Sequence, residues 1–407
     1  MKYLILLNRK FPYENGETFL ENEIDEISVF FDKILIFPSD MSPKSRMTRL
    51  IKSADVQPVI FEKHGARTRK IIYLIRGLFE HKDVGAKGIV QKWYSGYFEA
   101  AADLQSKNII RKLSQIPFRE DDEIIIYSYW FFVTAMTAVK IKKYLGGKVN
   151  VKCISRAHNF DIYEEKRYLP FRKSLLINLD AVFPCSENGS NYLKSKYPSF
   201  AGKIFTSYLG TYDHGKCCKK PSSIFRIISC SRVVPVKRLD LLIDSLKLLR
   251  SSGILFSWTH LGGGELLDHI KARADRELDF MEIDMPGMLS NAQVYECYRN
   301  TYYDIFVNVS SAEGLPVSIM EAFSFGIPAI ATDVGGNSEI VENGKTGFVL
   351  DPFFQPDELA ETLKEFARKP FEERQLFHNA AREMWSRKFQ APLNYKKFID
   401  QILCIDN

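Results

Sequence analysis

The stretch Val309-Ser-Ser-Ala-Glu-Gly-Leu-Pro-Val-Ser-Ile-Met-Glu-Ala322 predicts a strand end, a tight loop and the start of a helix. The apolar residues before it predict a short strand, Gly314 permits a turn, and Pro316 suits the first helical position, where no amide donor is needed. Glu313 then lies in the loop and Glu321 on the second turn of the helix. The free amides at this helix start favour an anion. The arrangement suits a ligand with hydroxyl groups at each end and phosphates between them, such as a nucleotide sugar.

Length and patterning predict two α/β domains. The chain has 407 residues, of which 45% are hydrophobic and 26% charged, and it is too long for one compact core. Short β-rich runs alternate with helical patterns, which is typical of parallel sheets. We predict a first domain over 1–208, a turn-rich linker over 209–223 and a second domain over 224–389. A last helix within about 390–407 belongs to the second domain or crosses back onto the first.

The predicted elements follow from these patterns. Strands are expected at 3–7, 33–37, 123–128, 149–155, 181–184, 225–230, 254–261, 280–284, 304–308, 328–332 and 347–350. Helices are expected at 17–30, 131–144, 187–197, 239–250, 265–277, 292–300, 317–325, 356–367 and 393–404.

Composition and spacing limit the chemistry. The seven cysteines are scattered without a CxxC spacing, so we expect reduced thiols and neither a disulfide framework nor a zinc site. No paired histidine spacing and no Asp-x-Asp occurs, so we expect no metal and no cofactor. The longest weakly polar run, 124–139, is too short to span a membrane, and the N-terminus lacks a secretion signal. We therefore expect a cytoplasmic protein.

Positive charge is concentrated in the first half. Residues 41–118 contain 15 Lys/Arg and 6 Asp/Glu, a local charge of +9, whereas the whole chain carries +6. Within this region 67–79 mixes cations with Ile, Leu, Tyr and Phe. One interpretation is a solvated helix face over a core. The other is a patch that docks on an anionic leaflet or on a lipid-linked acceptor, which would place the protein at the inner face of the membrane. Nucleic acid is not expected, because no binding motif accompanies the charge.

Two loops of the second half join the Glu313 loop in a candidate site. Arg232 and Lys237 flank a proline-containing loop after the strand 225–230, at the strand end where open α/β sheets bind ligands. A guanidinium fork and an ammonium are both suited to a diphosphate. A basic loop alone is more often plain surface, but its pairing with the Glu313 loop favours a site. Gly262-Gly263-Gly264 follows the next strand and is interpreted as cleft lining without a catalytic role, with a tight strand-to-helix connection as the alternative.

Two further candidates lie in the first half. His158 follows the strand 149–155, beside Arg156 and Asp161, and either contacts a sugar or is a structural histidine. Gly16 precedes the first helix and either brings backbone amides to a phosphate or acceptor, or marks a plain helix start.

These motifs together resemble the retaining GT-B glycosyltransferases of family 4 over nearly the whole chain. The E-x7-E signature is Glu313 to Glu321, and Ser231 to Lys237 resembles the family's donor-phosphate motif, with Ser231 where Gly is usual. The segment around His158 is also similar, with Asn159 where Gly is commoner. The opening F-P-Y-E-N-G-E-T-F-L-E-N-E-I resembles a subset that acts in bacterial exopolysaccharide and colanic-acid-type assembly.

The resemblance implies two Rossmann-like domains that face each other across a deep cleft, with the nucleotide on the second and the acceptor on the first. It implies that Glu321 binds the ribose and that His158 contacts the donor sugar. It also implies that Arg232 and Lys237 neutralise the departing diphosphate. The sugar and diphosphate would be held by Glu313 and by the backbone of Gly314, Leu315, Pro316 and Val317.

The expected activity is metal-independent, retaining transfer of a hexose from a UDP- or GDP-linked sugar to a glycan or lipid-linked acceptor in surface polysaccharide biosynthesis. A nucleotide-sugar epimerase, a sugar synthase of the same fold and a non-catalytic nucleotide-sugar-binding scaffold remain alternatives. A nicotinamide dehydrogenase is disfavoured, because no G-x-G-x-x-G follows the first strand.

Overall fold

The computed structural model describes residues 1–14, 17, 19–42, 44–49, 51, 53–58, 75, 83 and 85–405. The chain divides into two compact units. Unit 1 contains Met1–Tyr208 and Tyr395–Asn407, and unit 2 contains Leu209–Asn394. The segment 209–223, which we predicted as a linker, is thus included in unit 2.

Unit 1 is built on a six-stranded parallel sheet with strand order β3-β2-β1-β4-β5-β6. Its strands are β1 Lys2–Asn8, β2 Lys33–Pro38, β3 Asp55–Val56, β4 Glu123–Ser128, β5 Asn150–Ala157 and β6 Ala181–Pro184. Its helices of seven or more residues are α1 Leu20–Ile27, α3 Gly88–Leu113, α4 Val133–Leu145, α5 Arg172–Asn178 and α6 Glu187–Lys196, and the C-terminal part of α14 Ala391–Leu403 joins them.

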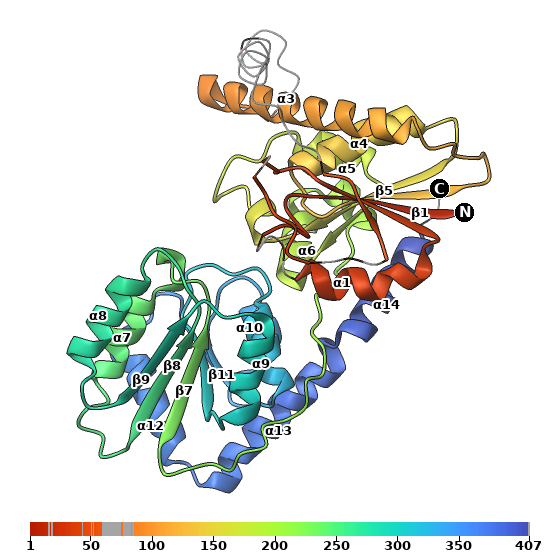
Figure 1. The fold of residues 1–407 in the computed structure, drawn as a ribbon. Helices are drawn as coiled ribbons and strands as arrows, with labels where there is room; N and C mark the ends of the chain where they lie inside the picture. Colours follow the sequence, from red (N-terminus) through yellow and green to blue (C-terminus); the bar gives the residue numbers. More distant parts are fainter. Residues whose placement is uncertain are drawn as a thin grey trace. The chain divides into compact units, whose positions relative to one another are not determined.

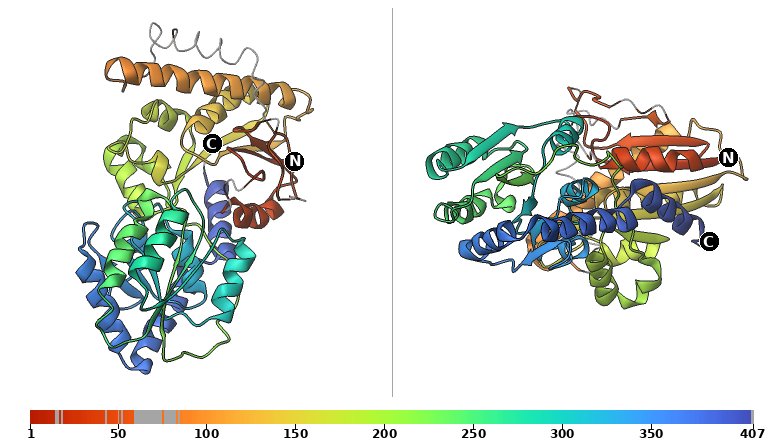
Figure 2. Two further views of the ribbon diagram at one scale, coloured as in Figure 1. Left: turned by 60° about the vertical axis from the view of Figure 1, so that its left-hand side comes forward. Right: turned by 90° about the horizontal axis from the view of Figure 1, so that it is seen from below.

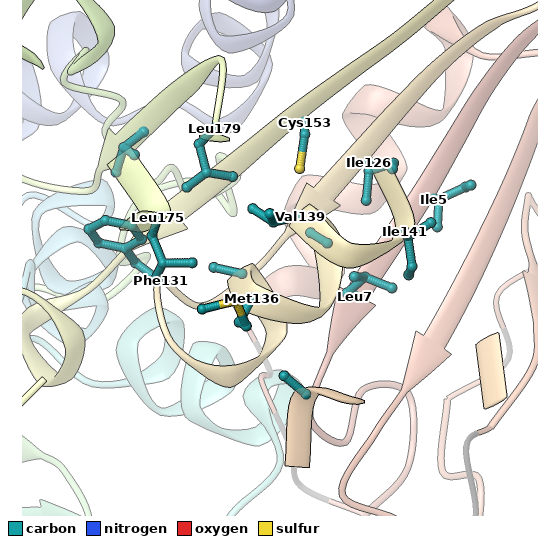
Figure 3. Packing of buried hydrophobic residues seen from close by; sticks show 14 of the residues in the cluster. Ile5, Leu7, Ile126, Phe131, Met136, Val139, Ile141, Cys153, Leu175 and Leu179 are labelled. Carbon is teal, nitrogen blue, oxygen red and sulfur yellow. The ribbon is translucent and has the colours of Figure 1, made fainter. Parts of the chain in front are cut away.

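Helices cover both faces of this sheet, with α3, α4 and α5 on one side and α1 and α14 on the other (Figure 1). The strands are apolar runs because both faces are buried, as expected for a parallel sheet. Figure 3 shows the core on the α4 side, where Met136, Val139 and Ile141 of α4 belong to one buried cluster with Ile5 and Ile126 of the strands.

Unit 2 repeats this architecture with strand order β12-β11-β10-β7-β8-β9, again all parallel. Its strands are β7 Phe225–Cys230, β8 Phe256–Leu261, β9 Glu282–Gly287, β10 Ile305–Asn308, β11 Ala329–Thr332 and β12 Gly347–Leu350. Its helices are α7 Leu239–Lys247, α8 Leu267–Glu277, α9 Asn291–Asn300, α10 Val317–Ser324, α11 Asn337–Ile340, α12 Pro356–Arg368 and α13 Phe371–Lys388. Helix α7 packs with α12, and α10 packs with α13, on opposite faces of the sheet (Figures 1 and 2).

The predicted two-domain α/β fold with parallel sheets is confirmed, and several boundaries differ. Helix α1 begins at Leu20 because Glu17 has a φ of 39°, which a right-handed helix cannot contain. Strand β9 ends at Gly287, later than predicted, and its Pro286 is tolerated because β9 lies at the sheet edge. The sequence patterns missed the long helices α3 and α13.

Candidate functional site

In unit 2, the loops that follow β7 and β10 lie side by side. These strands are neighbours in the sheet, so their carboxyl ends deliver both loops to the same edge. The Ser311 N–H donates to the Val236 carbonyl oxygen at 2.9 Å, which joins the loops directly. The basic loop and the Glu313 loop are thus brought together, although they are distant in sequence.

Lys237 and Glu313 form an ion pair between these loops. The Lys237 Nζ donates to Glu313 Oε1 at 2.5 Å. The same oxygen accepts hydrogen bonds from Ser310 Oγ at 2.6 Å and from Asn308 Nδ2 at 3.1 Å. All three donors converge on Oε1, and no described residue donates a hydrogen bond to the other carboxylate oxygen, Oε2. The Glu313 residue is nevertheless only 9% exposed. This second oxygen can accept a hydrogen bond from a ligand.

Two arginines of the same loop have different environments. Arg232 is exposed, and its guanidinium has no hydrogen-bond or ion-pair partner within the described part of the chain. Arg238, which the sequence analysis did not consider, adopts a φ of 50° and starts α7. Its guanidinium donates to the carbonyl oxygens of Val309, Ser310 and Pro352 at 2.6, 3.1 and 2.6 Å. Arg238 therefore fixes the loop, whereas Arg232 is available to a ligand.

The start of α10 offers backbone amides beside Glu313. Helix α10 begins at Val317, directly after Pro316, so its first amides lack partners within the helix. The preceding turn is held by Gly336, whose N–H donates to the Gly314 carbonyl oxygen at 2.6 Å. A Cβ on Gly335 would stand 2.0 Å from the Glu313 carbonyl oxygen, so only glycine allows this approach. The predicted strand, loop and helix start are observed here.

Glu321 lies on α10, half-buried, and Tyr295 holds it in place. The Tyr295 hydroxyl donates to Glu321 Oε1 at 2.9 Å, and the Tyr295 ring stacks on His214 with centroids 3.8 Å apart. Burial raises the pKa of Glu321 to about 7, and the hydrogen bond from Tyr295 opposes this rise. The carboxyl group therefore changes its charge near neutral pH. Sequence reasoning missed Tyr295 and His214, because neither lies in a motif.

The glycine run 262–264 has a packing role. A Cβ on Gly262 would lie 1.9 Å from the Ser231 carbonyl oxygen, and one on Gly264 would lie 2.3 Å from that of Val233. The Val233 N–H also donates to the Gly263 carbonyl oxygen at 2.9 Å. The glycines thus let the loop after β8 press against the basic loop, which is the tight connection expected for a strand-to-helix turn.

In unit 1, His158 is buried in a group of aromatic rings after β5. Its ring centroid lies 4.6 Å from that of Trp130, 5.1 Å from Tyr129 and 5.7 Å from Phe19. Both ring nitrogens are buried without a hydrogen-bond partner in the described structure. Burial, together with the charge of Arg156, lowers the pKa of His158 to about 3, so the imidazole is neutral at physiological pH. A neutral histidine can donate to or accept from a sugar hydroxyl.

The two residues predicted beside His158 have structural partners. Asp161 accepts hydrogen bonds from the N–H groups of His158 and Phe131 at 2.5 and 2.6 Å, which fixes the loop. Arg156 is fully buried and forms an ion pair with Glu23 of α1 at 3.0 Å. Its guanidinium also stacks on Phe398 of α14 at 4.5 Å. Arg156 therefore anchors α1 and α14 on the sheet.

The loop after β1 is organised by Glu17. Its carboxylate accepts hydrogen bonds from the N–H groups of Arg9, Lys10 and Phe11 at 2.8, 2.9 and 2.8 Å. It also accepts one from the Trp130 indole at 2.9 Å, which positions the ring that packs on His158. Gly16, the predicted amide donor, lies outside the described residues.

Two findings concern metals and membranes. Over the described residues, His, Cys, Asp and Glu side chains form no group of three or more that could hold a metal ion. Among the helices formed by those residues, none is both long and apolar enough to cross a bilayer.

Comparisons with known proteins agree with the fold and with the predicted class. Residues 219–384, which cover most of unit 2, match the family model for glycosyl transferases group 1. WcaL of Salmonella typhimurium, assigned to colanic acid biosynthesis as a glycosyltransferase, is 26% identical over 309 residues, 73% of each chain. The amylovoran biosynthesis glycosyltransferase AmsK of Erwinia amylovora is 22% identical over 361 residues, 85% of this chain and 86% of its own. The structure of HepE of Anabaena with UDP and glucose has a TM-score of 0.69 at 14% identity and covers 98% of this chain and 99% of HepE.

The fold is therefore GT-B, and the matches indicate a glycosyltransferase. The resemblance inferred from the sequence is confirmed at this level, including the likeness to colanic-acid-type enzymes.

Proposed function

We propose that this protein is a retaining hexosyltransferase that needs neither metal nor cofactor. It moves a hexose from a UDP- or GDP-linked sugar to a glycan or lipid-linked acceptor in surface polysaccharide biosynthesis. The observation that carries the proposal is the contact at 2.5 Å between Lys237 and Glu313, contributed by loops after neighbouring strands. A cation and a half-engaged carboxylate beside a helix start suit a diphosphate next to a sugar. HepE, which shares the fold, was solved with UDP and glucose.

The proposed roles follow from the charges. Negative charge develops on the leaving diphosphate as the glycosidic bond loosens, so the cations Arg232 and Lys237 stabilise the transition state more than the ground state. The amides of Gly314, Leu315 and Val317, which follow one another around Pro316, act on the same phosphates. The free oxygen of Glu313 accepts a hydrogen bond from the sugar.

One further side chain in each unit, Glu321 in unit 2 and His158 in unit 1, is proposed to contact the donor. Glu321 accepts hydrogen bonds from the ribose hydroxyls, with its orientation fixed by Tyr295. His158 binds a hydroxyl of the donor sugar through a neutral ring nitrogen. We assign none of these side chains the role of a nucleophile, and we propose that the acceptor attacks from the side of the departing diphosphate, which retains the configuration.

A test with nucleotide sugars separates this proposal from its competitors. Thermal unfolding with a panel of UDP- and GDP-sugars identifies the donor, because a ligand at 100 times its Kd stabilises the native state by about 2.7 kcal/mol. Product analysis with EDTA present should then show a retained glycoside only when an acceptor is added. Conversion of the donor alone would support an epimerase, and binding without turnover across donors and acceptors would support a scaffold. Either result, or loss of transfer on metal removal, would contradict the proposal.

We further propose that unit 1 contacts the inner face of the membrane from the cytoplasm through the basic region 41–118. Part of that region, including most of 67–79, lies outside the described residues. The described part includes the start of α3, which presents apolar and aromatic side chains on one face. These exposed side chains are Ile89, Val90, Trp93, Tyr94 and Tyr97. Such a face suits the headgroup boundary of an anionic leaflet, where aromatic rings and cations both bind.

Vesicle sedimentation tests this contact. Trp93→Glu should reduce binding to phosphatidylglycerol vesicles, because it places a charge in the apolar face. Val29→Glu is the matched control, since Val29 is 78% exposed in the short turn Ser28–Phe30 that follows α1, outside the basic region. Equal binding of the two variants would contradict membrane contact through α3 and leave the donor site unaffected.

A further inference from the structure

The segment Glu164-Glu165-Lys166-Arg167, after β5 in unit 1, separates its charges by sign. The two glutamates bind α6 and the residue after it. The Tyr197 hydroxyl donates to Glu164 Oε1 at 2.6 Å, and the Tyr192 hydroxyl donates to Glu165 Oε2 at 2.6 Å. Lys196 of α6 adds an ion pair to Glu165 at 3.0 Å. Both glutamates are therefore engaged on the α6 side, where Lys196 supplies one positive charge for the two carboxylates.

The basic half has no such partner. The Lys166 Nζ donates to Asn159 Oδ1 at 3.3 Å and lies 4.9 Å from the centre of the Tyr163 ring. The Arg167 guanidinium lies 3.7 Å from the centre of the Phe160 ring. Within the described residues neither cation has a carboxylate at ion-pair distance. Both side chains are exposed, and so is Phe160, at 43%.

This cation pair adjoins the aromatic group around His158. Two of its three contacts, Asn159 and Phe160, are the residues that directly follow His158. Trp130 connects the two features, since its ring lies 4.6 Å from His158 and 6.5 Å from Phe160. The cations are thus fixed next to the proposed sugar contact.

Two neighbouring cations without an acidic partner favour a bound anion. Partial burial lowers the pKa of Lys166, and the like charge of Arg167 lowers it further. An anion between them would remove this repulsion. A guanidinium fork matches the oxygens of a phosphate, and an ammonium adds a point charge.

We propose that Lys166 and Arg167, with the exposed ring of Phe160, form an acceptor subsite that binds a phosphate group carried by the acceptor saccharide. This inference rests on the proposed glycosyl transfer and deepens it, because it states what the acceptor must carry. The phosphate belongs either to a soluble sugar phosphate or to a lipid diphosphate that bears the saccharide. The subsite recognises the chemistry that both share.

Calorimetry on the full-length chain tests the subsite, with the donor site filled by UDP or GDP, whichever binds. The probes are glucose 1-phosphate, glucosyl farnesyl diphosphate and the uncharged octyl glucoside. The variants are Lys166→Gln/Arg167→Gln, which removes both charges, and Arg167→Lys, which keeps the charge and loses the fork. Lys173→Gln is the matched control, because Lys173 is also an exposed lysine close by in the chain.

We expect the double variant to lose at least about tenfold in affinity for a phosphate probe, with Arg167→Lys between it and wild type. Lys173→Gln should bind as wild type does. The tighter of the two phosphate probes identifies the soluble or the lipid-linked source. Equal affinity of the double variant and the control, octyl glucoside binding as tightly as the phosphates, or no phosphate binding would each overturn the subsite. Failure of wild type to bind any nucleotide would instead refute the proposed donor site.

Discussion

The residues proposed for the donor site in unit 2 carry formal charges, whereas the one proposed in unit 1 is a neutral histidine among aromatic rings. In unit 2, Glu313 is engaged by the ammonium of Lys237 and by two polar side chains on one oxygen. In unit 1, His158 packs against three rings, and burial keeps its pKa far below neutral. The charged residues suit a diphosphate, whose charge grows during reaction. The neutral group suits a sugar hydroxyl, whose charge does not.

The largest expected effect is the loss of kcat when a charged side chain of unit 2 is removed. Lys237→Ala should lower kcat by about 10²–10³-fold, because it removes a preorganised cation from the leaving group. Initial rates at saturating donor measure this. Lys345→Ala is the matched control, since Lys345 pairs with Glu342 at 2.8 Å on the exposed surface of the same unit. Activity of Lys237→Ala equal to that of the control would refute the proposed role of Lys237.

A smaller effect on kcat/KM is expected when His158 of unit 1 is replaced. His158→Phe should lower kcat/KM by about tenfold, the value of one lost hydrogen bond to the sugar. The melting temperature should stay level or rise, because the substitution removes two buried ring nitrogens that have no partner in the described structure. A variant with wild-type kinetics, or one with a much lower melting temperature, would assign His158 a purely structural role.

The pH dependence of nucleotide binding sharpens the comparison. The pKa of Glu321 is about 7, and the proposed contact with the ribose needs its carboxylate form, so the affinity for the donor's nucleotide should rise about tenfold from pH 6 to pH 8. Glu321→Gln should flatten this profile, and wild-type affinity that falls over the range would refute the assignment. The contribution of Glu321 to the stability of the fold changes with pH in the opposite direction. Because the folded pKa lies above the ordinary value of 4.5, the stabilisation is complete below pH 4.5 and is lost as pH rises through 7.

The smallest expected effect is on the loop that supports Trp130. Glu17→Gln retains one acceptor oxygen, but its amide group would face the N–H donors of Lys10 and Phe11, so the free energy of unfolding should fall by at least about 1 kcal/mol. Urea denaturation measures this. Glu120→Gln is the control, because Glu120 is an exposed glutamate of unit 1. An equal, near-zero change in both variants would show that the carboxylate does not hold the loop.

The meeting of the Lys237 and Glu313 loops in unit 2 could be predicted from the sequence, because both residues lie in short motifs at strand ends. Strand order then brings Lys237 to Glu313, as the carboxyl ends of neighbouring parallel strands meet at one edge. The sequence did not predict the roles of Arg238 and Tyr295. These roles come from contacts with Val309 and Glu321, which only the folded chain reveals. In unit 1, Trp130, Glu17 and His158 come from three separate segments, and no local pattern links them. Helix α3 was missed because both of its faces carry apolar residues, so its periodicity is weak.

The division of the chain into units has a consequence for biosynthesis. Tyr395–Asn407 belong to the unit formed by the first 208 residues, and Phe398 covers the guanidinium of Arg156. During translation, the ion pair between Arg156 and Glu23 therefore stays uncovered by Phe398 until the whole second sheet has left the ribosome. The half that is made first is therefore the last to be completed.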